Sequence, residues 1–93
     1  RLYSDLEKYK SAIVAINNSL QDYPDTKYRE ELIFLKLKAS YLLARNSIRS
    51  KQQERYQDTV DEYYTFIDEF PESEYAREAE RIYNESTEFL ANK

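Results

Sequence analysis

The amino-acid pattern of this chain recurs after 47 positions, and this repeat constrains the fold more than any other feature. The shift superimposes identical residues: Tyr9 on Tyr56, Pro24 on Pro71, Tyr28 on Tyr75 and Glu31 on Glu78. Similar residues match between them, such as Ile13 with Val60, Leu20 with Ile67 and Tyr23 with Phe70. Self-similarity at a fixed period is typical of folds that stack one structural unit. We therefore predict two copies of one unit.

The lack of Gly sets a second constraint. The chain contains no Gly and only two Pro residues. Tight hairpin turns depend on Gly, so a fold of short strands joined by such turns is disfavoured. Apolar residues recur instead at steps of three and four, which is the spacing of one face of an α-helix. The sequence therefore predicts an all-α fold, with residues 1–93 forming a single helical unit.

Four helices are predicted, at about residues 2–22, 26–44, 53–70 and 74–91. Each Pro ends one helix, and Thr26 is expected to cap the next helix with its hydroxyl group. The helix at 26–44 is apolar on more than one side, so we expect it to lie between other helices. Residues 45–55 break the apolar pattern and carry four positive charges against one negative. We interpret this segment as a long connector, with a partly helical conformation as the alternative.

The residue types exclude most reaction classes. With no His and no Cys, the chain has no imidazole base, no thiolate nucleophile and no transition-metal cluster of the ordinary type. With no Gly, it has no phosphate-binding loop and no helix-loop-helix calcium site. Adjacent acids such as Glu30 and Glu31 point about 100° apart on a helix and do not converge. We therefore expect no enzyme activity, no cofactor and no metal within these 93 residues.

Charge and length limit the possible partners and locations. The net charge of −4 argues against a nucleic-acid surface. No segment approaches the roughly 20 apolar residues that a membrane-spanning helix needs, so a soluble piece is expected. Because the chain starts at Arg1 and contains no Met, we expect it to be part of a longer protein. Any signal sequence or lipid-attachment site is then expected to lie outside it.

Residues 9–24 resemble the second helix of a tetratricopeptide repeat. The matching positions are an aromatic start, a small residue, apolar pairs and a final proline, at Tyr9, Ala12, Ile13, Ile16, Ser19, Leu20 and Pro24. Residues 56–71 repeat this pattern more loosely, and each Pro is followed by what resembles the first helix of the next repeat. The usual glycines are missing, and the period exceeds the usual value of about 34 residues. The resemblance implies a helical-repeat solenoid of about four antiparallel helices.

The turns at residues 22–28 and 69–75 narrow this resemblance. Their aromatic-proline-acid-hydroxyl order is similar to the turns of bacterial envelope repeat proteins. The chain most resembles the BamD-like family of outer-membrane assembly lipoproteins, in a Bacteroidetes-like version and in the C-terminal half of the parent. The resemblance implies a parent tethered by lipid to the periplasmic face of the outer membrane. It also implies a non-catalytic scaffold that docks onto the barrel-insertion subunit during β-barrel protein assembly.

First helices line the concave groove of tetratricopeptide arrays, so the resemblance also implies partner-binding residues. These candidates are Glu31, Phe34, Lys38, Tyr41, Glu78, Arg81, Glu85 and Glu88. The charged members can equally form a solvated face with ordinary ion pairs between residues three or four apart. Phe34 and Tyr41 can equally belong to the core.

Tyr64 is a further candidate for partner contact. It follows Tyr63 directly, and neighbouring helical residues cannot both face one layer. We therefore expect one of the two rings at the surface. Tyr64 then either keeps an ordinary amphipathic position with its hydroxyl in water or contacts a partner, because Tyr is enriched at interface anchors.

The sequence leaves alternatives for the function of the chain and for the role of its basic segment. A generic tetratricopeptide adaptor, periplasmic or cytosolic, is an alternative that would bind a peptide or protein in its groove. A repeat segment attached to an enzyme elsewhere in the parent is another. The basic segment 45–55 is either a solvated loop or a contact for anionic lipid or an acidic protein.

Overall fold

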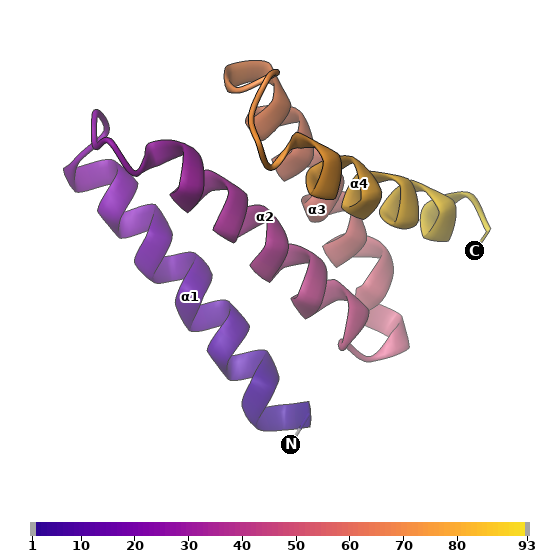
Figure 1. Ribbon diagram of the computed structural model, residues 1–93. Coiled ribbons are helices and arrows are strands. Elements are labelled where there is room, and N and C mark those ends of the chain that lie inside the picture. Colours follow the sequence, from indigo (N-terminus) through magenta and orange to yellow (C-terminus); the bar gives the residue numbers. More distant parts are fainter. Residues whose placement is uncertain (1, 93) are drawn as a thin grey trace.

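The computed structural model describes residues 2–92 of the chain. This part folds into four α-helices without strands: α1 (Leu2–Asp22), α2 (Arg29–Arg45), α3 (Arg49–Glu69) and α4 (Ala76–Ala91). Figure 1 shows α1 and α2 running side by side in opposite directions, with α3 behind α2 and α4 in front of α3. The all-α fold of four helices, predicted from the helical spacing and the lack of Gly, is confirmed.

Helix α2 is the centre of the structure. It packs against each of the other three helices, whereas α1, within the described residues, packs directly only on α2. Its apolar residues on several sides are buried accordingly, including Ile33, Leu37 and Ala44. The two-sided apolar pattern of this segment therefore reflects neighbours on both sides.

The connector between α2 and α3 is shorter than the sequence indicates. Only residues 46–48 separate the two helices, so the predicted connector at 45–55 differs from the structure, in which residues 49–55 form the first turns of α3. The polar side chains there cap the end of α2: the Gln52 amide donates to the carbonyl oxygens of Ala44 and Arg45 at 3.2 Å each. Capping of these free carbonyl groups accounts for the polar side chain at Gln52 within the helix.

The two proline turns have the same backbone structure. In each turn a hydroxyl accepts a hydrogen bond from the amide two residues later, from Tyr28 to Thr26 at 3.2 Å and from Tyr75 to Ser73 at 3.0 Å. The helices begin only after these tyrosines, so Thr26 orders the turn and is not the N-cap residue that the sequence predicts. No described residue has a positive φ angle, which explains why these turns form without Gly.

The hydrophobic core lies between α2, α3 and α4. Phe66, Leu37 and Ile82 are fully buried there. The Phe34 ring stacks on Tyr75 at a centroid distance of 4.6 Å and meets Phe66 at 5.8 Å. These aromatic contacts join the two repeat units because Phe34 belongs to the first and Tyr75 to the second.

Equivalent positions of the two repeats differ in burial. Ile82 on α4 is 1% exposed, whereas Leu35, 47 positions earlier on α2, is 42% exposed. Helices α2 and α4 are equivalent in the two repeat units, and α4 packs against α2. Within the described residues no helix occupies the corresponding place beside α2.

This difference yields a stability prediction. Ile82→Ala is expected to lower the free energy of unfolding by roughly 2–5 kcal/mol, because it leaves a cavity in the core. Leu35→Ala, the matched control, is expected to cost less than about 1 kcal/mol. Urea denaturation followed by circular dichroism measures both losses. Equal losses would show that the two positions are equally buried in solution.

Candidate partner-binding site

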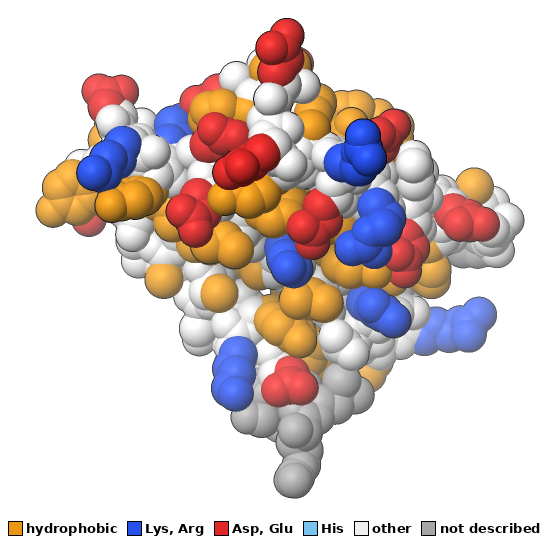
Figure 2. Space-filling view, viewed as in Figure 1, with side chains coloured by type: hydrophobic (Ala, Val, Ile, Leu, Met, Phe, Trp, Pro, Cys, Tyr) orange, Lys and Arg blue, Asp and Glu red, His pale blue; other side chains and the backbone are white. Residues whose placement is uncertain are grey.

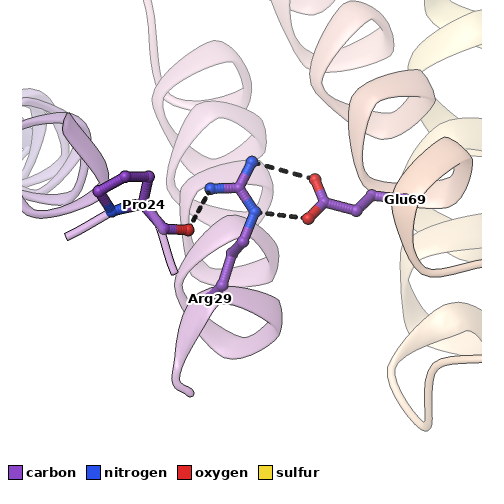
Figure 3. Close-up of polar contacts among 3 residues, drawn as sticks. All are labelled: Pro24, Arg29 and Glu69. Carbon is purple, nitrogen blue, oxygen red and sulfur yellow. Dashed lines mark hydrogen bonds and ion pairs between the residues drawn. The ribbon is translucent and has the colours of Figure 1, made fainter. Parts of the chain in front are cut away.

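An ionic contact fixes the two repeat units at one end of the molecule (Figure 3). The Arg29 guanidinium on α2 donates from Nε to Oε2 of Glu69 at 2.5 Å and from Nη2 to Oε1 at 3.1 Å. Its Nη1 donates to the carbonyl oxygen of Pro24 at 3.0 Å. The hydrogen bond to Glu69 raises the pKa of Arg29. Arg29 therefore ties the first proline turn to the end of α3.

The face formed by α2 and α4 carries paired charges. Lys38 Nζ on α2 lies 3.4 Å from Oε2 of Glu78 on α4, and Arg81 Nη2 lies 3.9 Å from the same oxygen. Figure 2 shows acidic and basic side chains interspersed across this face, with apolar side chains between them. The structure thus brings together three of the predicted site residues. We call Lys38, Glu78 and Arg81 the charged ridge.

Two predicted site residues lie in the core. Phe34 and Tyr41 are each only 4% exposed, so their rings offer no surface to a partner. Their burial agrees with the alternative that both residues belong to the core. The Tyr41 hydroxyl reaches the edge of the core, where Arg45 Nη1 lies 3.5 Å away. Burial and the nearby Glu85 carboxylate raise the pKa of Tyr41. These rings support the α2–α4 face from below.

Leu35 is exposed on α2 and was not among the predicted site residues. It lies one turn after Glu31, which is also exposed, and three residues before Lys38. The repeat aligns Leu35 with Ile82, which is a core residue, so the alignment indicated that Leu35 belongs to the core as well. The sequence signal that could have identified Leu35 was its spacing of four residues from Glu31 and three from Lys38, which places all three on one face of the helix.

A groove opens between the start of α3 and the end of α4. Its lining includes Glu85 and Glu88, which the sequence predicted, and Arg49 and Gln53, which it assigned to the connector. At its base the rings of Tyr56 and Phe89 lie 4.4 Å apart. Burial, with smaller effects from Tyr41 and Glu85, raises the pKa of Tyr56. The groove therefore combines an aromatic base with charges of both signs.

Tyr64 lies in a separate cluster with Tyr63 and Tyr83. Tyr64 is 50% exposed as a residue, and its hydroxyl lies 2.8 Å from that of Tyr83 on α4. The structure therefore does not bring Tyr64 together with the charged ridge or the groove. No group of acidic side chains within residues 2–92 is arranged to hold a metal ion.

Comparison with known families decides what kind of protein carries this surface. Residues 2–93 match the model of the YfiO family, described as outer membrane lipoprotein. The chain belongs to this family. The match confirms the BamD-like family expected from the proline turns, and YfiO proteins act in outer-membrane assembly, which implies protein partners.

Two further findings accompany the YfiO match. No curated protein matches the chain. Over the described residues, none of the helices combines the length and the apolar character needed to cross a membrane.

The buried tyrosines of this YfiO chain predict a loss of stability at high pH. Burial raises the pKa values of Tyr41, Tyr56 and Tyr63 in the folded state. Above the unfolded pKa of about 10, the unfolded chain loses these protons first, so the free energy of unfolding falls as pH rises. Tyr56→Phe is expected to reduce this fall relative to wild type in urea titrations from neutral to alkaline pH. Tyr23→Phe, at a ring that is 70% exposed, is the matched control, and equal effects would contradict the burial argument.

A double-mutant cycle tests the Arg29 contact. Arg29→Ala and Glu69→Ala are expected to show a coupling energy of about 1 kcal/mol, the upper end for exposed pairs, because the contact is bidentate. The coupling should decrease at high salt, since both side chains are partly exposed. The longer Arg81–Glu78 pair is the control and is expected to couple more weakly. Urea denaturation supplies the energies, and equal couplings would contradict the prediction.

Proposed function

We propose that this chain is a non-catalytic docking scaffold in outer-membrane β-barrel protein assembly. The observation that carries the proposal is the YfiO match over residues 2–93, a family of outer membrane lipoproteins. The proposed partner is the barrel-insertion subunit of the assembly machinery. The proposed location is the periplasmic face of the outer membrane, with the lipid anchor outside this chain. The Bacteroidetes-like version and the position in the C-terminal half of the parent stay predictions from the turn motifs.

The groove between α3 and α4 is the proposed docking site. The half-buried ring of Phe89, which packs on the buried ring of Tyr56, offers apolar contact to an inserted side chain, and such anchors dominate binding energies. Glu85 and Glu88 on one side favour basic partner residues, while Arg49 adds one positive charge opposite them. Docking of this kind needs no reacting group.

The charged ridge is proposed to set orientation. Its ion pairs are exposed, and charges at the rim of an interface affect association rate and specificity more than affinity. The exposed side chain of Leu35 lies beside Lys38 and extends the apolar contact along α2. Together the ridge and the groove give the partner a surface formed by α2, α3 and α4.

Reversal of the groove charges tests this proposal. The lipidated full-length protein carrying Glu85→Arg and Glu88→Arg is expected to lose capture of the barrel-insertion subunit from solubilised envelope. Reversal at Glu7 and Asp22, two exposed acids on α1, is the matched control and should retain capture. Mass spectrometry identifies the captured proteins, and circular dichroism checks folding.

Two outcomes would contradict the proposal at different levels. Capture that survives reversal at Glu85 and Glu88 in a folded protein would remove the groove as the docking site. No capture of any assembly subunit by the wild-type lipoprotein would instead remove the assembly role. A peptide-binding adaptor of other function would then be favoured.

A further inference from the structure

A cluster of three tyrosines forms a second surface on α3 and α4. The Tyr63 and Tyr83 rings stack at a centroid distance of 4.4 Å, and Tyr64 meets both edge-on at 5.7 and 5.5 Å. Tyr64 is half exposed, so part of this aromatic surface faces solvent. Tyr23 and Tyr28 are exposed as well, so exposure alone does not single out Tyr64. What distinguishes Tyr64 is that its ring adjoins two others, because contiguous aromatic surface marks interaction sites and Tyr is enriched at interface anchors.

The charges around this tyrosine cluster are acidic. Asp61 and Asp68 lie three and four residues from Tyr64, and Glu80 lies three residues from Tyr83, so each acid shares a helix face with a cluster ring. No Lys or Arg occupies such a position next to any of the three rings. Burial, followed by Glu80, raises the pKa of Tyr63, and no cation contributes. Asp68 and Glu80 take part in no ion pair within the described residues, whereas Asp61 accepts a hydrogen bond from Gln57 and lines a pocket with Lys36 and Arg55.

The repeat indicates which kind of occupant fits this face. A shift of 47 residues aligns Glu80 and Asn84 on α4 with Ile33 and Leu37 on α2, which are buried in the core. A further helix that packed on α4 as α3 packs on α2 would need apolar residues at these two positions of α4. On α4 the same positions are exposed and polar, one of them acidic. The face therefore suits a polar, basic segment better than another helix of the repeat.

The tyrosine cluster lies apart from the proposed docking groove. Tyr83 and Glu85 are two residues apart on α4, so their side chains point about 200° from each other around the helix. A ligand in the groove therefore leaves the cluster accessible. This separation makes the second surface independent of the proposed function.

We propose that the cluster of Tyr63, Tyr64 and Tyr83 binds an arginine-containing basic segment of a protein partner. A guanidinium group stacks on the exposed face of Tyr64 and is attracted by the ring. Its planar group also donates hydrogen bonds to nearby carboxylates, which Asp68 and Glu80 supply. The complementarity of charge and the aromatic surface together select arginine over a neutral side chain.

Peptide binding to the intact chain tests this proposal. Three capped peptides of equal length alternate Ser with Arg, Lys or citrulline, the last being the neutral analogue of Arg. NMR shifts of the tyrosine rings locate binding, with each ring assigned by a Tyr→Phe variant. The Arg peptide is expected to shift the rings of Tyr64 and Tyr83 and not that of Tyr56, the Lys peptide to bind more weakly, and the citrulline peptide not to bind.

Substitutions in the cluster supply the matched variants. Tyr64→Leu is expected to weaken binding of the Arg peptide roughly two- to fivefold, the contribution of one exposed cation–π contact, whereas Tyr64→Phe keeps the ring and should retain most of it. Asp68→Asn with Glu80→Gln should also weaken binding, and these exposed positions provide the test if Tyr64→Leu loses helix content by circular dichroism.

Four results would overturn the proposal. They are equal binding of the Arg and citrulline peptides, ring shifts confined to Tyr56 in the groove, unchanged affinity in the folded Tyr64→Leu variant, and burial of the cluster by a second copy in sedimentation and NMR. Loss of envelope capture in the groove variant leaves this result unaffected, since the two surfaces are tested separately.

Discussion

The structure depends on the burial of α2 from several sides at once. Its apolar residues cannot be covered by one neighbour, so α1, α3 and α4 must all pack around it. Fully burying one large apolar side chain contributes roughly 1.5–3 kcal/mol, and Leu37 and Ile33 are among several on this helix. The surface left on α2 is a narrow strip with Glu31, Leu35 and Lys38. The α2 part of the candidate surface is thus the strip that the packing of this helix leaves open, while the groove lies between α3 and α4.

The sequence predicted the number of helices and the turns well, because helical periodicity and Pro are local signals. It placed Phe34 and Tyr41 at the surface as one alternative and overlooked Leu35. The repeat alignment assumes that equivalent helices have equivalent neighbours. Helix α4 packs on α2, its equivalent in the preceding repeat unit, whereas within residues 2–92 no equivalent helix packs on α2 in that way. Periodicity shows which residues are apolar; it does not show which neighbour covers them.

The groove and the tyrosine cluster were harder to predict for another reason. Arg49 and Gln53 belong to a polar segment whose composition is that of a loop, although it forms the start of α3 and its Gln52 bonds the last carbonyl groups of α2. Tyr64 could be identified from its neighbour Tyr63, but its contact with Tyr83 joins residues 19 positions apart. Contacts between helices depend on tertiary packing, which single-sequence patterns do not encode.

The proline turns need no positive φ angle, so they form without Gly, and the absence of Gly also affects the unfolded chain. Gly makes an unfolded chain more flexible, and each Gly replaced without strain stabilises a protein by about 0.4–1 kcal/mol through the lower entropy of its unfolded state. A chain that closes both of its proline turns without Gly therefore begins folding from a less disordered ensemble. For a protein of this size, part of the stability thus resides in the restricted freedom of the denatured polypeptide and not in any contact of the folded one.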